Sequence, residues 1–321
     1  MKNDNVIAAG AGELAHQKRF ASFALPLPPA LAAGRREIDG RSGKLSYYVA
    51  GKGPPLLLIH SINAAASAFE VRPIFETMQA QRRVYAVDLP GFGFSDRTVR
   101  DYNVRLYVDA VQDMLDAIAS DRGFDPIDAL ALSLSAEFLA RAAALAPQRL
   151  RRLIFVAPTG LSRPPTVADA GSDVHGTREI AGLLWALQVP LWRQRIFDLL
   201  VSRASIRYFL GRAWGSKHID EALFRYCFLT AHRPGACNAP YAFVSGRLFS
   251  KDVVRLYMSL KMPVLVCRGT RGEFQDMGGL GRVSALPNWS VQTFDSGAMP
   301  QFERATEFNS ALTRFLEAPV P

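Results

Sequence analysis

The sequence predicts an α/β protein with a mostly parallel, doubly wound sheet and a helical insertion after its sixth strand. Short apolar runs alternate with segments of helical periodicity through the first half of the chain and again near its end. This alternation is typical of parallel sheets covered by helices. Between about residues 161 and 260 the alternation stops and only helical segments occur. One α/β domain that carries an insertion of about a hundred residues accounts for both observations.

The composition describes an ordinary globular protein and excludes several other classes. The 321 residues are 49% hydrophobic and 21% charged, which argues against disorder and coiled coils. The net charge of +9 can favour nucleic acid, an anionic membrane face or anionic substrates. The positive residues are dispersed and form no basic strip interleaved with aromatic residues, so we expect neither nucleic-acid binding nor membrane-surface binding. No run of about 18 apolar residues exists, so we expect no stable membrane insertion.

Cysteine usage and the N-terminus bear on the compartment. Cys227, Cys237 and Cys267 form no CxxC pair and no Cys/His ligand spacing, which favours a reducing compartment over a disulfide framework. The first twenty residues make a poor secretory signal, because polar and acidic residues interrupt their short apolar stretches. We therefore expect a cytoplasmic protein. Without a cluster of ligand spacing, we expect no metal and no cofactor.

The first half of the chain supplies most of the expected sheet. Residues 56–59 form a continuous apolar run, which is typical of a strand buried on both faces. Leu106, Val111, Met114 and Ile118 recur at helical spacing. By the same criteria we expect strands at residues 36–39, 44–50, 56–59, 84–88, 128–132 and 153–156, and helices at residues 64–81, 103–120 and 136–146.

The second half separates an insertion from the end of the sheet. Helical segments are expected at residues 180–189, 192–201 and 219–230, followed by strands at 263–267 and 290–294 and a helix at 303–316. The expected organisation is an N-terminal arm at residues 1–35, a core domain at residues 36–160 and 255–321, and a helical cap at residues 161–254.

One strand-to-helix turn has the composition of a nucleophile elbow. It lies in the segment IDALALSLSAEFLARAAALAPQRL. Such an elbow needs small residues two positions on either side of the nucleophile, because the backbone is strained and the helix packs tightly on the strand. Ser133 is flanked by Ala131 and Ser135, which are both small. Ser135 is flanked by Ser133 and Glu137, and a glutamate fits that crowded turn poorly. Ser133 is therefore the predicted nucleophile.

Three segments carry a resemblance to a known family. They are SLSAEFLARAAALAPQRLRRLIFVAPTG after the elbow, LLLIHSIN and YAVDLPGFGFSDR. Together with the C-terminal strands they resemble the α/β-hydrolase fold superfamily with a helical cap domain, over residues 36–160 and 255–318. Pro147 and Arg149 fall in register with the family when Ser133 is the nucleophile. The resemblance implies the α/β-hydrolase fold.

In this resemblance LLLIHSIN corresponds to the oxyanion loop. His60 matches the family's histidine, and Ser61 stands where glycine is usual. The backbone N–H groups of Leu134 and Ile62 are then the two expected oxyanion donors. Because histidine is the usual proton carrier near neutral pH, His60 can also be interpreted as a base. The resemblance favours a role in organising the loop.

The glycine-containing loop PGFGFSDR has a competing interpretation as a nucleotide site. A dinucleotide fingerprint needs GxGxxG at the start of a helix directly after the first strand, and this segment is a loop. We expect Asp88 to cap that loop rather than to bind a ribose.

The chain departs from the family at the third member of the catalytic triad. The family closes with a strand, Gly-His, Pro and then Glu at the last helix, and this chain has SVQTFDSGAMPQFERATEF. Gly297, Pro300 and Glu303 match, but Ala298 stands at the histidine position. Alanine cannot take the proton of a serine, and a serine without a base is a weak nucleophile at neutral pH.

The acidic member of the triad is irregular as well. The family places an Asp in a Gly-x-x-Asp turn after the strand VLVC. Counting from Gly269 reaches Gly272, so Glu273 is the first candidate and Asp276 the second. Both also fit the description of solvated loop carboxylates.

The missing base leaves three interpretations open. A cap histidine, His175, His218 or His232, can reach the cleft, and His232 leads because Pro- and Gly-rich bends often face a cleft. Each of these histidines is also an ordinary surface or helix-end residue in the alternative view. The cleft can instead catalyse elimination, isomerisation or cyclisation without an acyl-enzyme, or it can bind a ligand without turning it over.

The composition of the expected cap indicates the substrate class. Trp185 lies among aliphatic residues, and a cap of this kind over the elbow predicts a largely apolar pocket. Arginines in the same segment fit either a site for an anionic group or a solvated face: Arg193, Arg195, Arg203, Arg207 and Arg212. We predict a serine-hydrolase-like enzyme of esterase or thioesterase type that acts on an ester, thioester or related carbonyl of an apolar small molecule. The alternative is a non-hydrolytic or ligand-binding member of the fold.

Overall fold

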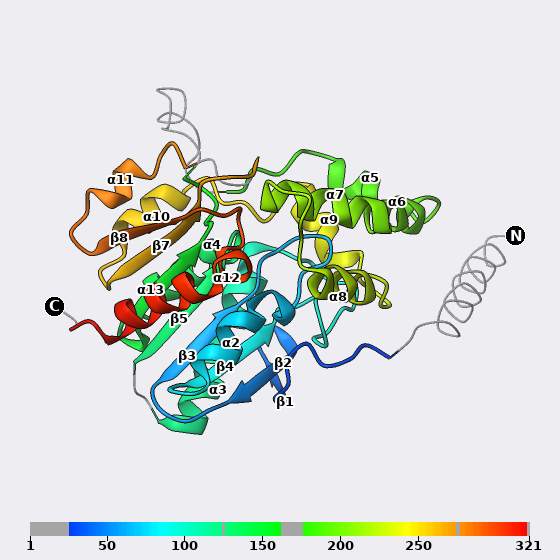
Figure 1. Ribbon diagram of the computed structural model, residues 1–321. Coiled ribbons are helices and arrows are strands. Elements are labelled where there is room, and N and C mark those ends of the chain that lie inside the picture. The colour runs from blue at the N-terminus through cyan, green and yellow to red at the C-terminus, as the bar shows by residue number, and fades with distance from the viewer. Residues whose placement is uncertain (1–25, 124–125, 162–175, 274–276, 320–321) are drawn as a thin grey trace, which may run out of the picture.

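The computed structural model describes residues 26–123, 126–161, 176–273 and 277–319. The strands are β1 Gly34–Gly40, β2 Gly43–Ala50, β3 Pro55–Ile59, β4 Arg83–Asp88, β5 Ile127–Leu132, β6 Leu150–Val156, β7 Val264–Gly269 and β8 Trp289–Phe294. They form one sheet in the order β1-β2-β4-β3-β5-β6-β7-β8 (Figure 1). β2 is antiparallel to both of its neighbours, and every other pairing is parallel. The predicted fold class is confirmed.

Helices cover both faces of the sheet (Figure 1). One face carries α2 Arg72–Met78, α12 Pro300–Glu303 and α13 Ala305–Glu317. The other face carries α3 Val104–Arg122, α4 Ser135–Leu145, α10 Val253–Ser259 and α11 Gly281–Ser284. Successive side chains of a strand point to opposite faces, so β3 contributes to both cores. Leu57 and Ile59 pack with α3 and α4, whereas Leu56 and Leu58 pack with α2 and α13. The continuous apolar run of β3 follows from this double burial.

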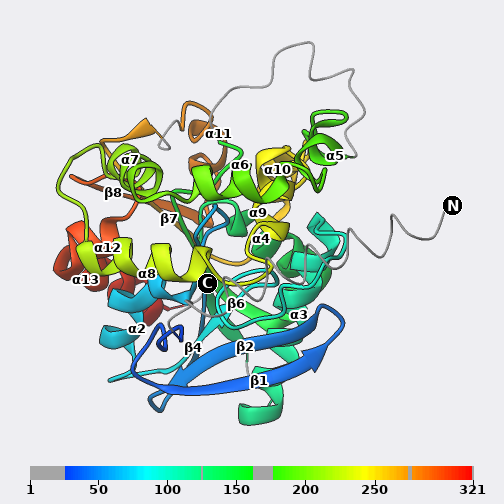
Figure 2. The same cartoon turned by 90° about the vertical axis from the view of Figure 1, so that its right-hand side faces the viewer.

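Five of the described helices lie beyond the carboxyl ends of the strands, between β6 and α10 (Figure 2). They are α5 Leu183–Leu187, α6 Arg193–Leu200, α7 Arg203–Trp214, α8 Glu221–Ala231 and α9 Asn238–Val244, and we call them the inserted helices. They follow the sixth strand, as predicted. The sequence did not single out α7 or α9. Ser202 caps α7 by accepting a hydrogen bond from the N–H of Ser205, a local signal that an apolar pattern does not reveal.

Two predicted helices have different boundaries in the structure. The helix expected at residues 64–81 begins only at the 3-10 turn η1 Ala68–Val71, which leads into α2. The side chain of Asn63 accepts a hydrogen bond from the N–H of Ala65 at 2.7 Å, and this local turn keeps the preceding residues out of the helix. The helix expected at residues 303–316 starts earlier, at Pro300, and is interrupted at Arg304, where ψ is 46°.

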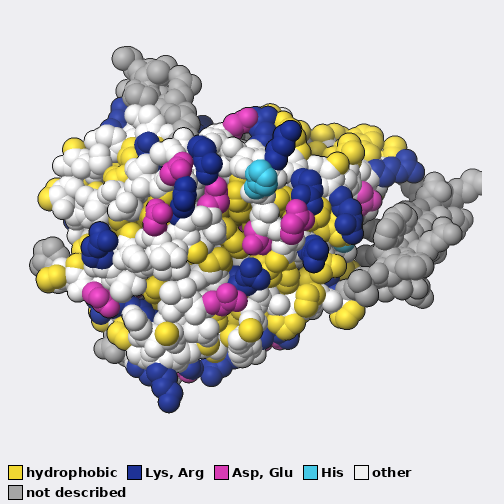
Figure 3. All heavy atoms as spheres, in the orientation of Figure 1, with side chains coloured by type: hydrophobic (Ala, Val, Ile, Leu, Met, Phe, Trp, Pro, Cys, Tyr) yellow, Lys and Arg dark blue, Asp and Glu magenta, His cyan; other side chains and the backbone are white. Residues whose placement is uncertain are grey.

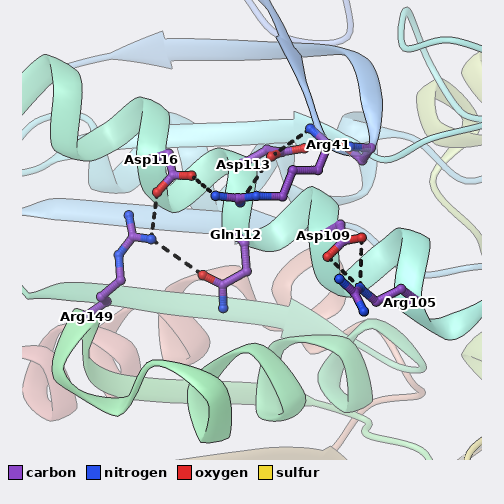
Figure 4. A network of polar contacts seen from close by, with 8 residues as sticks. Arg41, Arg105, Asp109, Gln112, Asp113, Asp116 and Arg149 are labelled. Atoms are coloured by element: carbon purple, nitrogen blue, oxygen red, sulfur yellow. Dashed lines mark hydrogen bonds and ion pairs between the residues drawn. The ribbon is translucent and has the colours of Figure 1, made fainter.

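The polar side of α3 ties neighbouring segments to the sheet (Figure 4). Arg41, in the turn between β1 and β2, bonds to Asp113 and Asp116, and Arg149 bonds to Asp116 from the other side. Asp113 also accepts hydrogen bonds from the N–H and the hydroxyl of Ser42. These contacts join the turn between β1 and β2 and the segment before β6 to α3.

The structure also bears on membrane-spanning helices and on the state of the cysteines. Among the described helices, none combines the length and the apolar character needed to cross a membrane. The thiols of Cys227, Cys237 and Cys267 are free and buried.

The segment before β1 packs against the sheet domain. Beside the N-terminal end of β1, Leu27 and Leu31 are buried, and the N–H of Ala30 donates to the hydroxyl of Tyr48 at 2.9 Å.

Candidate functional site

The turn between β5 and α4 holds Ser133 in a strained backbone conformation. Ser133 has a φ of 51°, and Ala157 is the other non-glycine residue with positive φ among the described residues. Positive φ costs free energy for a residue with a Cβ and persists only where the surroundings impose it. Here the N–H of Ser133 donates to the carbonyl of Val156 at 2.8 Å, and its own carbonyl accepts from Ala136 at 3.1 Å. This strained strand-to-helix turn has the form expected for a nucleophile elbow.

The two serines of the turn have different surroundings. Ser135 is fully buried, and its hydroxyl donates to the carbonyl oxygen of His60 at 2.6 Å. Ser133 is half-buried, and its hydroxyl makes no hydrogen bond with another described residue. The Ser135 hydroxyl is therefore part of the fold, while that of Ser133 is left for other partners.

The loop after β3 lies beside this turn. β3 and β5 are neighbours, with Ile59 opposite Ala131, so the segments that follow them meet at one edge of the sheet. The backbone N–H groups of Ile62 and Leu134 have no hydrogen-bond acceptor within the part of the chain that the structure describes. Two unpaired donors beside a serine can stabilise negative charge on a bound group.

The imidazole ring of His60 is hydrogen-bonded to two loops, those after β3 and β4. Its ring is fully buried, Nδ1 bonds to the carbonyl oxygen of Ser61 at 2.6 Å, and Nε2 bonds to the N–H of Leu89 at 2.9 Å. Since a backbone N–H can only donate, Nε2 is the acceptor and Nδ1 carries the proton. Burial lowers the pKa of His60 to about 4, so the ring is neutral at pH 7. Neither nitrogen is available to take a proton from a serine.

Glu70 organises the same loop, and sequence reasoning missed it. Its buried carboxylate accepts from the N–H of Ser61 at 2.8 Å and from the side-chain amide of Asn63 at 2.8 Å. Burial raises its pKa. Its backbone carbonyl accepts from the side chain of Gln301, whose Oε1 is buried with no partner among the described residues. Glu70 thereby connects the loop after β3 to the segment after β8. The available signal was an acidic residue inside the otherwise apolar stretch SAFEV.

Position 298 lies in the loop after β8 and is covered by the end of α7. The N–H of Ala298 donates to the carbonyl of Ala213 at 2.8 Å. The neighbouring Gly297 N–H donates to Glu303 at 2.7 Å, so Glu303 holds the loop as a side-chain acceptor. Ala298 is half-buried and supplies no group that can take up a proton.

The two described candidate replacement histidines are exposed and make no hydrogen bond to Ser133. His232 ends α8, is exposed, and bonds through Nδ1 to the carbonyl of Phe228 at 2.7 Å. His218 is exposed between α7 and α8. His175 lies outside the described residues. None of the hydrogen bonds of the described histidines involves Ser133.

The acidic candidates and Trp185 also face other surroundings. Glu273 follows β7, is half exposed and forms an ion pair with Arg212 of α7. Asp276 lies outside the described residues. Trp185 is exposed on α5, with its indole facing solvent. Two open cavities of about 450 and 440 Å³ have neither Ser133 nor Trp185 among their lining residues.

Asp88 caps the loop after β4, as expected. Its buried carboxylate accepts from the N–H groups of Ala68 at 2.9 Å and Phe94 at 3.0 Å. Gly93 has a φ of 48°, and a Cβ there would lie 1.9 Å from the Asp88 carboxyl carbon. The Asp88 cap thus requires glycine at position 93, which explains this glycine without a nucleotide.

The chain resembles members of one fold family both in sequence and in structure. Residues 54–198 match the family described as alpha/beta hydrolase fold. The chain is 32% identical over 262 residues to 1-acylglycerol-3-phosphate O-acyltransferase ABHD5 of Sus scrofa, covering 78% of this chain and 72% of that protein. It is 30% identical over 133 residues to 2-hydroxymuconate semialdehyde hydrolase of Pseudomonas sp. strain CF600, an alignment that spans 41% of this chain and 46% of that enzyme. A probable hydrolytic enzyme of Pseudomonas aeruginosa PAO1 has a similar structure, with a TM-score of 0.69 and 20% identity, over 90% of this chain and 96% of that chain.

Proposed function

Because this chain belongs to the alpha/beta hydrolase fold family, we propose that it is an enzyme in which Ser133 attacks the carbonyl carbon of an ester, thioester or related group in an apolar small molecule. The observation that carries the proposal is the backbone of Ser133, whose φ of 51° at a strand-to-helix turn is the conformation that presents a nucleophile in an elbow. The hydrolases among its relatives support this reaction class.

The proposed chemistry uses groups of this chain at each step. The Ser133 oxygen forms a bond to the carbonyl carbon, and the carbonyl electron pair moves onto oxygen. The N–H groups of Leu134 and Ile62 stabilise that oxyanion. The alcohol or thiol then leaves with the electron pair of the broken bond and takes up a proton, and water releases the acyl group from Ser133. The buried side chains of His60 and Glu70 hold the loop that carries Ile62 in place: His60 bonds to the N–H of Leu89, and Glu70 bonds to the N–H of Ser61.

The missing base sets the expected rate. The proton of the Ser133 hydroxyl has no side-chain acceptor at position 298, so it passes to solvent. Removal of one triad member leaves about 10³–10⁴-fold acceleration over the uncatalysed reaction, supplied by the oxyanion hole and by binding. We therefore infer slow turnover, with Ser133 weakly activated.

A second candidate function is a non-hydrolytic or ligand-binding role for the same cleft. Its support is the hydrogen bond from Ala298 to Ala213, which covers the position of the usual base with the end of α7. A cleft with oxyanion donors and no base can position a substrate for elimination or isomerisation, or hold it unchanged.

Labelling with a fluorophosphonate, read by intact and peptide mass spectrometry, separates the two candidates. The first predicts one label per chain, at Ser133, which Ser133→Ala removes. Ser133 and Ser135 share a peptide, so fragment ions must place the label. A label on Ser135 contradicts the proposal. The second candidate predicts no label on the wild type under conditions where Ala298→His becomes labelled.

A further inference from the structure

The first two inserted helices expose large apolar side chains to solvent. Trp185, Leu191 and Leu199 are 76%, 75% and 74% exposed. Figure 3 shows hydrophobic side chains gathered on the part of the surface where α5 and α6 lie, with Lys and Arg side chains beside them. We call this surface the α5–α6 face and define it by its exposed apolar residues: Trp185, Leu191, Trp192, Ile196 and Leu199.

Helix α6 is apolar on two sides, although packing in the fold requires only one. Phe197 is buried and covers the inner side. Trp192, Ile196 and Leu199 are spaced i, i+4 and i+7, so they form a stripe on the outer side. Scattered exposed leucines are common on proteins, but a contiguous patch rimmed by polar residues marks an interaction surface.

The charge of this segment indicates the chemistry of its partner. Residues 180–217 contain six arginines and lysines and one acidic residue, Asp198, which gives +5 of the chain's net +9. The net positive charge is therefore concentrated in this segment and is not dispersed as expected from the sequence. Arg195, Arg203 and Lys217 are exposed and form no ion pair with the described residues. Arg203 instead lies over the ring of Phe228 at 4.6 Å. Unpaired cations beside an apolar stripe are complementary to a surface that is negatively charged outside and apolar beneath.

We propose that the α5–α6 face binds reversibly to the surface of an anionic phospholipid membrane. The aliphatic side chains and the two tryptophans enter the boundary between headgroups and acyl chains, and Arg195 and Arg203 contact lipid phosphates. Trp185 suits this boundary because its ring is apolar while its N–H can bond to polar groups, whereas the N–H of Trp192 already donates to the carbonyl of Ala186 at 2.8 Å, so this residue contributes its apolar ring. A membrane accounts for the apolar stripe and the unpaired cations together. The proposal does not depend on catalysis at Ser133, and its test contains no turnover step.

The tryptophans of the full chain report on the contact directly. Of the four, Trp214 and Trp289 are buried, so solvent-sensitive emission comes from Trp185 and Trp192. Vesicles of one part phosphatidylglycerol to two parts phosphatidylcholine should shift the emission to shorter wavelength and sediment the protein. Vesicles of phosphatidylcholine alone should bind at least about fivefold more weakly, since each Lys or Arg near an anionic surface adds about 1 kcal/mol. Raising the salt concentration should weaken the anionic binding.

Two variants and a matched control locate the surface. Leu191→Ser with Leu199→Ser should lower the partition coefficient at least about tenfold, because two buried leucines are lost. Arg195→Glu with Arg203→Glu should abolish the preference for anionic vesicles. Leu145→Ser makes the same change at an exposed leucine on the last turn of α4, and it should bind as the wild type does. Circular dichroism confirms that each variant is folded.

Three results would overturn the proposal. The first is an emission spectrum that vesicles of either composition leave unchanged. The second is equal binding to anionic and neutral vesicles. The third is a wild-type dimer that Leu191→Ser with Leu199→Ser converts to a monomer without any vesicle binding, which would assign the α5–α6 face to a second copy of the chain.

Discussion

The N–H of Ala298 donates a 2.8 Å hydrogen bond to the carbonyl oxygen of Ala213, the penultimate residue of α7. The same contact is tight at the neighbouring residue, where a Cβ on Gly297 would lie 2.3 Å from that oxygen and 2.5 Å from Trp214 Cα. The end of α7 and the loop after β8 are therefore packed as one unit. This contact decides how much room a side chain at position 298 has and how firmly the inserted helices are held.

Gly297→Ala should loosen this contact. The added methyl group meets backbone atoms, which cannot move aside as a flexible side chain can. Overpacking of this kind costs about 1–3 kcal/mol of unfolding free energy. Urea denaturation should show that loss, and hydrogen exchange should show faster exchange at the Ala298 amide.

Gly281→Ala is the matched control, because a Cβ there meets nothing within 4 Å and the residue begins the short helix α11. It should be neutral or stabilising. Equal stability of Gly297→Ala and Gly281→Ala would show that α7 is not held at this point.

Ala298→His tests whether the site is complete apart from its base. General-base catalysis typically contributes about 10²–10⁴-fold. Glu273 is paired with Arg212 and does not orient an imidazole at position 298, so we expect the lower part of that range. The rate of fluorophosphonate labelling at Ser133 should rise about 10²-fold. Ala298→Asn introduces a polar side chain without a titrating ring, and it should leave the labelling rate unchanged. Equal rates for His and Asn would mean that position 298 does not face Ser133.

The sequence predicts the elements whose signals are local. The strands follow from short apolar runs, and the turn at Ser133 follows from small residues at fixed offsets. The hydrogen bond between Gln301 and Glu70 joins residues that are 231 positions apart, and no local sequence pattern at either residue predicts it. The ion pair of Glu273 with Arg212 similarly depends on where α7 ends. Both contacts join segments that are far apart in the sequence and meet only in the folded chain, so local sequence patterns do not predict them.

Glu137 shows the same limit in another way. In the sequence it is notable only as a side chain too large for the elbow. In the structure it is buried in the first turn of α4, where it accepts hydrogen bonds from the hydroxyl of Thr159 and from the N–H of Ser250 at 2.9 Å. Thr159 leads out of β6 and Ser250 leads back toward α10, so one carboxyl group binds the two connections of the inserted helices.

Glu137→Gln should change how stability depends on pH. Burial raises the pKa of Glu137 to about 7 from 4.5. Its contribution to stability is therefore fully present below pH 4.5 and is lost as pH rises through 7. The glutamine can accept from Ser250 and donate to Thr159 without ionising. The stability of the wild type relative to Glu137→Gln should fall by on the order of 3 kcal/mol from pH 4.5 to 8, in urea denaturation at a series of pH values.

The control for this series is Glu76→Gln, which makes the same change at an exposed position on α2. Its stability should follow that of the wild type at every pH. If the difference between the wild type and Glu137→Gln does not vary with pH, the carboxyl group is not protonated in the folded state.

His60 should produce the opposite trend in the acid range. Its folded pKa of about 4 lies below the ordinary value of 6.5, so its contribution is present above pH 6.5 and is lost as pH falls through 4. The stability of the wild type relative to His60→Gln should thus decrease on acidification by on the order of 3 kcal/mol. The exposed His218 makes His218→Gln the matched control, with no such trend. Nitrogen NMR of the imidazole provides an independent measurement: at pH 7 the proton should be on Nδ1, because Nε2 accepts from Leu89. A ring that titrates near 6.5, or one with its proton on Nε2, would mean that His60 does not fix the loop and is free to act as a base.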